Sequence, residues 1–230
     1  MAANPPAPHS SETAMDFRTL PVTLFQQNCT LLWCEATRRT VVIDPGGEAP
    51  RILRLLEDLK LEPERILLTH GHLDHVGATA DLVDHLGIPV WGPHLDDAFL
   101  IEALDQQCAM FGVPPLRGFE PDHWLAQGDT VTVGEATLEV LHCPGHSPGH
   151  LVYFHAAGRL AQIGDVLFQG SIGRTDLPGG NHQQLIESIT ERLFPLGDDV
   201  RFIPGHGPTS TFGTERRTNP FVRPAARSPL

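Results

Sequence analysis

The chain has 230 residues, 40% of them hydrophobic, which is enough to bury a sizeable core in one domain. Its 28 Asp and Glu against 16 Lys and Arg give a formal net charge of −12. This balance argues against a nucleic-acid partner, because proteins that follow a phosphate backbone neutralise it with basic patches. The 13 histidines make imidazole the unusual feature of the composition.

Both ends of the chain are expected to lie outside the folded domain. Residues 1–15 are rich in Pro, Ser and Ala and have no signal-peptide pattern, so we predict a disordered tail there. The domain is predicted over residues 16–212, followed by a polar C-terminal tail over 213–230 with no added helical domain. No apolar run approaches the ~20 residues that span a bilayer. We therefore predict no membrane partner and a cytoplasmic location.

The first half of the domain alternates strand and helix patterns. Strands are expected at 17–25, 28–35, 40–43, 65–69 and 88–91, and helices at 49–61 and 76–86. Gly87 is expected to end the second helix. Residues 92–122 contain a helical stretch and a Pro-rich loop with room to shape a pocket.

The second half consists mainly of short strands. They are expected at 130–133, 136–142, 150–155, 160–163 and 200–203, with a helix at 182–193 that Asn181 caps. This order predicts an α/β fold in which mixed sheets are sandwiched by helices.

One short block concentrates metal-binding residue types. His70, His72, Asp74 and His75 fall within six residues, directly after an apolar strand. His70 and His72 can point to one side of an extended segment, whereas Asp74 and His75 begin the next turn and can face a second position. Gly71 lets the backbone bend closely around a bound group.

Three more candidates follow later strands. His146, Asp165 and His206 each lie in a Gly-rich bend after β-type residues, where α/β folds assemble their sites. Five imidazoles and two carboxylates exceed the needs of one tetrahedral ion but suit two. Such ligands, without thiolate, suit zinc, iron or manganese. His142 and His150 are expected to pack beside these residues or to hydrogen-bond one of them.

The block Thr-His-x-His-x-Asp-His at 69–75, with His146, Asp165 and His206 downstream, resembles the metallo-β-lactamase-fold hydrolases. The segments Asp-Pro-Gly-Gly at 44–47 and Gly-Arg-Thr-Asp at 173–176 make the chain most similar to the short bacterial branch of the glyoxalase II group, the hydroxyacylglutathione hydrolases. The resemblance implies a four-layer αββα sandwich with mixed sheets.

It also implies a dinuclear site with two divalent ions, zinc first and iron or manganese as alternatives. One ion would be held by His70, His72 and His146, and the other by Asp74, His75 and His206. Asp165 would bridge the two ions.

The implied reaction is hydrolysis of a small-molecule thioester, a glutathione conjugate in this group. A hydroxide shared by the two metals would attack the thioester carbonyl, and Asp74 would act as the catalytic residue that orients the water and accepts its proton. Asp44 is expected to support a ligand or to form a turn. Arg174 is the candidate for a substrate carboxylate, with a structural salt bridge as the alternative.

Other functions stay open at this point. They are an iron-dependent persulfide dioxygenase, a lactonase or other ester hydrolase of the same fold, and a non-catalytic protein that binds metal or a thiol conjugate. The sequence does not predict an oligomeric state.

Overall fold

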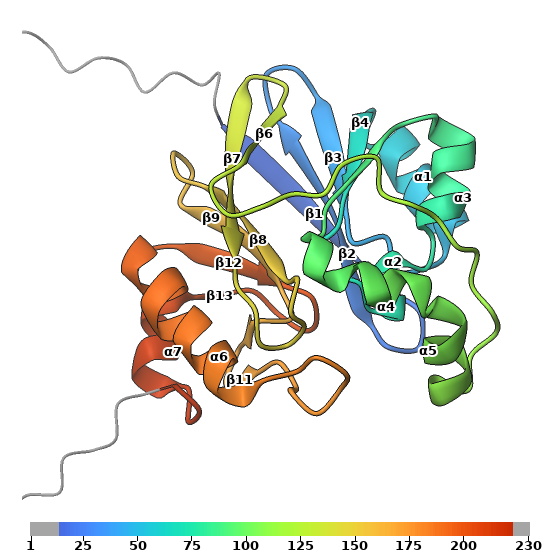
Figure 1. Ribbon diagram of the computed structural model, residues 1–230. Coiled ribbons are helices and arrows are strands. Elements are labelled where there is room, and N and C mark those ends of the chain that lie inside the picture. Colours follow the sequence, from blue (N-terminus) through green and yellow to red (C-terminus); the bar gives the residue numbers. More distant parts are fainter. Residues whose placement is uncertain (1–13, 223–230) are drawn as a thin grey trace, which may run out of the picture.

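A computed structural model describes residues 14–222 of the chain (Figure 1). The elements of the first half are β1 (Met15–Val22), β2 (Gln27–Cys34), β3 (Arg39–Ile43), α1 (Ala49–Asp58), β4 (Glu62–Leu67), α2 (Leu73–Val76), α3 (Thr79–Leu86), β5 (Val90–Trp91), η2 (Leu95–Asp97), α4 (Ala98–Glu102) and α5 (Leu104–Phe111). Those of the second half are β6 (Thr130–Val133), β7 (Ala136–His142), β8 (Leu151–His155), β9 (Leu160–Gly164), β10 (Leu167–Phe168), β11 (Ser171–Ile172), α6 (His182–Glu187), η3 (Ser188–Leu193), η4 (Phe194–Leu196), β12 (Arg201–Pro204), β13 (Ser210–Thr211) and α7 (Phe212–Thr218).

Each half of the chain forms its own sheet. The first half forms a five-stranded sheet in the order β1-β2-β3-β4-β5, and the second a six-stranded sheet in the order β13-β12-β9-β8-β7-β6. The pairs β3–β4, β4–β5 and β9–β12 are parallel, and the other pairs within these two sheets are antiparallel. Both sheets are therefore mixed, as the sequence pattern predicts.

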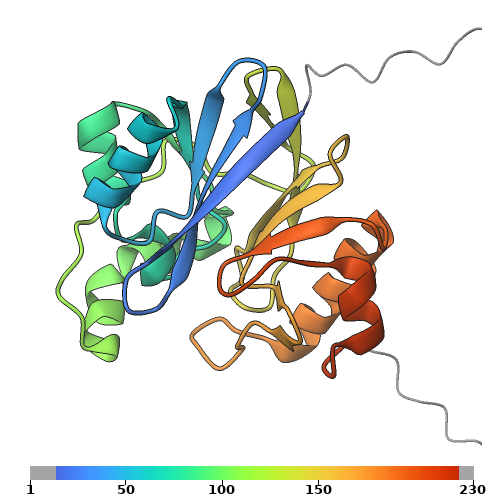
Figure 2. The same cartoon turned by 180° about the vertical axis from the view of Figure 1, so that it is seen from behind.

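Apolar residues divide into three buried groups that define four layers. Val41 and Leu67 of the first sheet pack with Leu138 and Tyr153 of the second, between the sheets. A second group joins the first sheet to α1 and α3, and a third joins the other sheet to α6, η3 and α7 (Figures 1 and 2). Each fully buried aliphatic side chain stabilises this packing by roughly 1.5–3 kcal/mol. The predicted αββα sandwich is confirmed.

Local signals place several helix ends where the sequence predicts them. Gly87 takes a left-handed conformation at φ 62° and ends α3. The Asn181 side chain accepts a hydrogen bond from the Gln184 amide and caps α6. The predicted helix at 182–193 continues beyond α6 as the π-helical segment η3.

The predicted C-terminal tail differs from the structure in its first part. Helix α7 begins at Phe212, whose ring is fully buried and stacks on Phe202 with centroids 5.4 Å apart. The Glu215 carboxylate is buried too, and it accepts hydrogen bonds from the Gly170 amide and the Asn219 side chain. These few anchors hold a segment whose polar and basic composition is typical of a tail. Residues 223–230 lie outside the described part.

The predicted N-terminal tail overlaps the structure only at its last residues. Met15, the final residue of the predicted 1–15 tail, begins β1 and pairs with Cys34. Residues 1–13 lie outside the described part. Within residues 14–222, no helix has the length and apolar character needed to cross a bilayer.

The two sheets are joined by backbone hydrogen bonds along one edge. The Leu151 amide donates to the Thr69 carbonyl at 2.7 Å, and the Asn28 amide donates to the Gly205 carbonyl at 2.7 Å. The first bond joins the loop after β4 to β8, and the second joins β2 to the loop after β12. This edge also carries the segments that follow β4, β7, β9 and β12, so candidate ligands from both halves meet there.

Candidate metal centre

The 70–75 block changes from extended to helical conformation within a few residues. His72 has φ −74° and ψ 146° and stands just before α2, which contains Asp74 and His75. His70 and His72 therefore lie on the extended part, and Asp74 and His75 on the helical turn. This separation gives the block two directions, as the sequence pattern predicts.

Asp165 and His206 are brought together by parallel neighbouring strands. Asp165 follows β9, His206 comes soon after β12, and the Gly205 amide donates to the Gly164 carbonyl at 2.7 Å. A side chain at residue 205 would place Cβ 2.1 Å from Asp165 Oδ1 and 2.7 Å from the His75 ring. Glycine at this position therefore allows the second sheet to approach the block from the first.

One group of candidate ligands consists of His70, His72 and His146. A ligand nitrogen of each lies within 4.8 Å of the others, and all three residues are buried. The closest pair is His72 Nδ1 and His146 Nε2, 2.9 Å apart. We call these three residues set one.

A second group consists of Asp74, His75 and His206. Their ligand atoms also lie within 4.8 Å of one another, and His206 Nε2 is 3.2 Å from Asp74 Oδ2. We call these residues set two. Each set combines two neighbours from the 70–75 block with one histidine from the second half.

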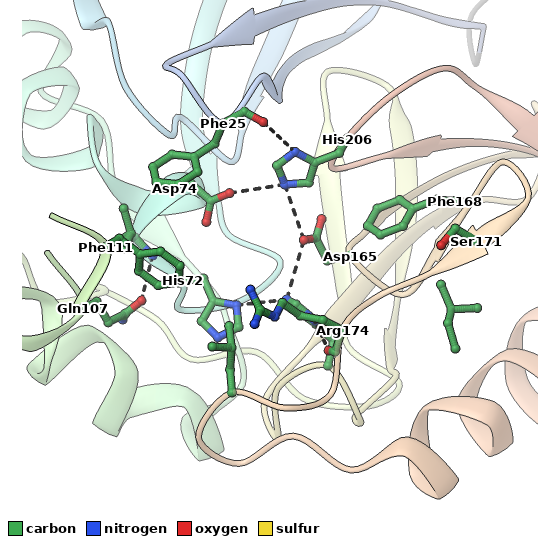
Figure 3. A pocket seen from close by; sticks show the side chains of 14 residues that line it. Phe25, His72, Asp74, Gln107, Phe111, Asp165, Phe168, Ser171, Arg174 and His206 are labelled. Carbon is green, nitrogen blue, oxygen red and sulfur yellow. Dashed lines mark hydrogen bonds and ion pairs between the residues drawn. The ribbon is translucent and has the colours of Figure 1, made fainter. Parts of the chain in front are cut away.

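Asp165 lies between the two sets. Its Oδ2 atom is 3.6 Å from His146 Nε2 of set one and 3.5 Å from His206 Nε2 of set two (Figure 3). Its Oδ1 atom is 3.4 Å from His75 Nε2. A carboxylate in this position can give one oxygen to each of two cations.

Four of the histidines are held in the same way, by an oxygen that accepts a hydrogen bond from the nitrogen facing away from the sets. His70 Nδ1 donates to Thr69 Oγ1, His75 Nδ1 to Asp44 Oδ2, His146 Nδ1 to the Arg174 carbonyl and His206 Nδ1 to the Phe25 carbonyl, at 2.8 to 3.1 Å. This arrangement directs Nε2 of each ring at the site, where it is the nitrogen that a metal ion would bind. Histidine ligands of metals are oriented by such partners.

Asp44 supports one ligand of each set. Its Oδ2 atom accepts from His75 Nδ1 at 2.9 Å and from the Thr69 hydroxyl at 2.6 Å, and Thr69 in turn accepts from His70. Its Oδ1 atom accepts from the Thr69 amide at 2.7 Å. Asp44 is fully buried and has a φ of 50°, a conformation that L-residues rarely adopt. The interpretation of Asp44 as a support for the ligands agrees with these contacts.

The centre contains buried polar atoms that no group of the protein satisfies. Among the atoms directed at the site, Nε2 of His70 and His75 and Oδ1 of Asp165 are buried without a hydrogen-bond partner, whereas His72 faces His146 through Nδ1. Leaving such atoms unpaired costs about 1–3 kcal/mol each. Imidazole nitrogens and carboxylate oxygens that converge in this way are the donors that divalent transition metals use, so the residues fit two such ions.

The two sets differ in charge. Burial and the neighbouring histidines lower the pKa of His70 far below its usual value, and burial and His146 lower the pKa of His72 to about 3. Burial also lowers the pKa of His206, but hydrogen bonds to Asp165 and Asp74 outweigh burial and raise this pKa to about 9. Set one is therefore neutral in the metal-free protein, whereas His206 carries a proton at pH 7.

His150 positions the Asp165 carboxylate between the two sets. It is fully buried, its Nε2 accepts a hydrogen bond from the Asp165 amide at 3.0 Å, and its ring stacks on His70 with centroids 4.8 Å apart. His142 Nε2 donates to the Pro148 carbonyl at 2.7 Å, in the loop that carries His146. Both contacts agree with the supporting roles expected for these histidines.

Asp97 is a supporting residue that sequence reasoning missed. It is fully buried, with Oδ2 accepting from the Gly71 amide at 2.9 Å and Ser147 Oγ at 2.8 Å, and Oδ1 accepting from the Gly149 amide. Burial raises the pKa of its carboxyl to about 6, although these hydrogen bonds lower it. Asp97 joins the loop of His70 and His72 to the loop of His146. An Asp-Asp pair in a polar stretch gives no sequence signal for such a role.

Gln107 is a second missed residue, and it attaches α5 to the same loop. Its side-chain oxygen accepts from the Leu73 amide at 3.0 Å, and its side-chain nitrogen donates to the carbonyls of Gly71 and Leu100. The segment 92–122, predicted to shape a pocket, thus places α4 and α5 beside the metal-binding residues.

Arg174 lies at the site, but its guanidinium already has a partner. Nε and Nη2 bind the two carboxylate oxygens of Asp176 at 2.7 and 2.8 Å, and the side chain is 54% exposed. Of the two roles considered for Arg174, the observed contact is the salt bridge. Its backbone carbonyl has a separate role as the acceptor for His146 Nδ1.

A cavity of about 350 Å³ opens over both sets. Its wall includes His72, Asp74, His146, Asp165 and His206, together with Phe25, Leu73, Gln107, Phe111, Phe168, Ser171, Ile172, Arg174 and Leu177 (Figure 3). The candidate ligands therefore line a space that a small molecule can enter.

Residues 22–212 match the model of the metallo-beta-lactamase superfamily. The chain belongs to this superfamily. It is 47% identical to the hydroxyacylglutathione hydrolase GloC of Haemophilus influenzae, over 90% of this chain and 98% of that protein. A probable metallo-hydrolase of Bacillus subtilis, YqgX, is 38% identical over 90% of this chain and 98% of that protein. The superfamily and these relatives make this chain a hydrolase.

Solved structures agree with this assignment. The B3 metallo-beta-lactamase BLEG-1 superposes with a TM-score of 0.84 at 38% identity, over 90% of this chain and 99% of that one. TTHA1623, solved in a di-iron-bound form, has a TM-score of 0.80 at 40% identity, over 89% and 99%. ETHE1 from Myxococcus xanthus has a TM-score of 0.75 at 29% identity, over 90% and 84%.

Proposed function

We propose that this protein is a hydroxyacylglutathione hydrolase-like thioester hydrolase with a dinuclear metal centre. The observation that carries the proposal is the position of Asp165, within 3.4 to 3.6 Å of histidine nitrogens from both sets. A carboxylate between two complete ligand sets is what a pair of ions needs. The similarity to GloC supports the choice of thioesters as substrates.

His70, His72 and His146 would hold one ion and Asp74, His75 and His206 the other, with Asp165 shared. Zinc is our first choice, with iron or manganese as alternatives, since imidazole and carboxylate ligands suit all three. When bound, two divalent ions lower the pKa of a shared water and stabilise negative charge on a reacting oxygen.

Asp74 is placed to orient the attacking water and accept its proton. Its carboxylate lines the cavity, and Oδ2 is 3.2 Å from His206 Nε2. Burial opposes ionisation of Asp74, but the charge of His75 and the hydrogen bond from His206 outweigh burial and lower the pKa of its carboxyl. Asp74 is therefore ionised at neutral pH and can act as a base.

Hydrolysis of a thioester needs no separate general acid from this chain. The leaving group is a thiol whose pKa is about 8.5, so it can depart as thiolate near neutral pH. Such a leaving group suits this cavity, because both acidic side chains in its wall, Asp74 and Asp165, are candidate metal ligands.

A glutathione conjugate can reach a cation at the rim of the cavity. Arg174 is exposed and lines the 350 Å³ cavity, and its guanidinium binds Asp176 through two hydrogen bonds. A substrate carboxylate would take the place of Asp176 in the same two-hydrogen-bond geometry. Such an exchange is feasible because both side chains are largely exposed.

A second candidate function is persulfide dioxygenation with a single iron. The persulfide dioxygenase family is similar to this chain in its fold and in a Gly-Arg-Thr-Asp loop, here at 173–176, so this candidate stays in the test. The completeness of set two favours hydrolysis, because a single-iron enzyme does not need a second group of ligands.

The deciding experiment uses protein with measured metal content in two parallel assays. One follows hydrolysis of lactoylglutathione, and the other follows oxygen uptake with glutathione persulfide. We expect thioester hydrolysis that scales with metal up to two ions per chain. Oxygen uptake with one iron and no thioester hydrolysis would select the dioxygenase, and no turnover in either assay would favour a lactonase or a binding protein.

A further inference from the structure

An apolar pocket adjoins the metal centre on the side of set one. It has a volume of about 130 Å³ and lies between α4, α5 and the 177–178 loop. Its wall consists of Phe99, Leu100, Ala103, Met110, Phe111, Leu177 and Pro178, with His72, Gln106 and Gln107. No Asp, Glu, Lys or Arg is among these lining residues. We call this space the α5 pocket.

The α5 pocket borders the main cavity. Four residues line both spaces, namely His72, Gln107, Phe111 and Leu177. Figure 3 shows Phe111 and Gln107 beside His72, on the opposite side of the centre from Phe168 and Ser171. An acyl group held at the metal centre would reach the α5 pocket past His72, which lines both spaces.

The pocket exposes large apolar side chains. Phe99, Met110 and Phe111 are 41%, 63% and 38% exposed, and they account for half of the six exposed large hydrophobic residues within the described chain. Clustered exposed apolar groups mark a binding surface more often than isolated ones do. Gln107 cannot serve as a free donor there, because both hydrogens of its side-chain nitrogen already bind carbonyls.

Volume decides which part of a thioester fits. The α5 pocket, at about 130 Å³, has little more than a third of the volume of the 350 Å³ cavity, so it suits a short chain better than a peptide thiol such as glutathione. The 350 Å³ cavity, whose wall includes Phe168, Ser171 and Arg174, has room for that larger part. The acyl side of the substrate is therefore the part that matches the α5 pocket.

We propose that the α5 pocket binds an unbranched aliphatic acyl chain, so that this enzyme prefers thioesters of short fatty acids to thioesters of acetate. This inference rests on the proposed thioester hydrolysis and assigns its acyl specificity to Phe99, Ala103, Met110 and Leu177. Burial of one methylene contributes ~0.8 kcal/mol, which corresponds to about fourfold in kcat/KM.

The test compares S-acyl glutathiones with acetyl, butyryl, hexanoyl and decanoyl chains, and lactoylglutathione, on metal-loaded protein. We expect kcat/KM to rise about fourfold per methylene from acetyl to hexanoyl and to stop rising before decanoyl. Equal rates with acetyl and hexanoyl would overturn the pocket assignment and leave the proposed function intact. Failure to hydrolyse any of these thioesters would overturn both.

Substitution of a pocket residue tests whether the α5 pocket determines the acyl-chain preference. Ala103→Leu fills the pocket and is expected to lower the hexanoyl-to-acetyl ratio of kcat/KM about tenfold or more. The matched control is Ala109→Leu, because Ala109 is exposed on α5, the helix that follows Ala103, and lies outside the pocket lining; it should keep the wild-type ratio. An unchanged ratio in Ala103→Leu, with metal content verified, would contradict the proposal.

A loop variant tests the same wall without altering α5. Leu177→Ala removes pocket surface from a segment outside the helices and strands. We expect a lower hexanoyl-to-acetyl ratio of kcat/KM, because the hexanoyl chain loses its contact with Leu177, and a higher decanoyl-to-hexanoyl ratio, because the pocket becomes larger. A Leu177→Ala ratio equal to that of the wild type would also count against the acyl pocket.

Discussion

The two halves of the chain contribute to the metal centre in different ways. The first half supplies four candidate ligands from six consecutive residues, His70 to His75, on one loop and one short helix. The second half supplies three ligands from three separate loops, at His146, Asp165 and His206. The first contribution depends on local backbone conformation, and the second on strand pairing between segments far apart in the sequence. The centre therefore forms only when both sheets are assembled.

Asp165, which lies between the two sets, should produce the largest effect when it is changed. Asp165→Ala removes the carboxylate between the sets, so we expect bound metal to fall by at least one ion per chain and thioester hydrolysis to fall by more than ~1,000-fold. Metal analysis and lactoylglutathione turnover measure the two effects. His70→Ala should behave similarly.

The control for Asp165→Ala is Asp58→Ala, since Asp58 is an exposed carboxylate at the end of α1. Its metal content and activity should match the wild type. Full activity of metal-depleted Asp165→Ala protein would contradict the proposed mechanism.

A substitution at Asp44 tests how strongly metal binding by the 70–75 block depends on its hydrogen bonds to Asp44. Asp44→Asn keeps the size of the side chain but puts an amide where Oδ2 now accepts from Thr69 and His75. We expect metal affinity to fall by about 10- to 100-fold, the usual effect of losing such a partner. Competition with a chelator measures it. Asp58→Asn serves as the control. A metal affinity of Asp44→Asn equal to that of the wild type would show that the ligands do not need Asp44 for their orientation.

The difference in charge between the sets predicts a difference in pH dependence. His206, with a pKa of about 9, must lose its proton to bind metal, whereas His72, with a pKa of about 3, is already neutral at pH 7. Metal affinity at set two should rise with pH by about tenfold per unit per proton released between pH 7 and 9. Set one should change little over the same range.

Titration of metal-free protein by calorimetry at pH 7, 8 and 9 distinguishes the two affinities. The raised pKa of His206 also stabilises the metal-free fold fully below pH 6.5, and this contribution is lost as pH rises through 9. Equal pH slopes for both ions would contradict the assignment of charge.

Asp97 joins the loops of the two halves and should produce the smallest effect on chemistry. Asp97→Asn places an amide donor against the amides of Gly71 and Gly149 or the Ser147 hydroxyl. We expect a loss of ~1–3 kcal/mol in the free energy of unfolding and a few-fold loss of metal affinity. Thermal or urea unfolding measures the first. Asp96→Asn, at the exposed neighbouring residue, is the control and should leave stability unchanged.

Strands and helices with clear periodicity were predictable from the sequence, and elements held by few contacts were not. The alternation of strands and helices predicted the layers, and Gly87 and Asn181 marked helix ends that the structure confirms. Helix α7 was missed because Phe212 and Glu215 anchor it inside a stretch of polar composition. A few buried residues do not produce a periodic pattern, so the polar composition of this stretch led to the prediction of a tail in place of α7.

The candidate site shows the same division. The 70–75 block was recognisable because its residue types crowd into one bend, and Asp44 was expected to support it. Asp97 and Gln107 were not recognisable, since each acts through backbone groups of residues 26 to 36 positions away. Arg174 was predicted as a carboxylate-binding residue from its residue type, but its ion pair with Asp176 depends on the conformation of the 173–176 loop.

By itself the sequence determined the layered α/β class, the residue types of the centre and the order in which they occur. The family resemblance implied the two ligand sets, but only the tertiary structure decided the distances that bring each set together and place Asp165 between them, and that an apolar pocket adjoins His72. The physical reason is that residue type fixes what an atom can bind, whereas distances between loops depend on the register of parallel strands and on packing between two sheets.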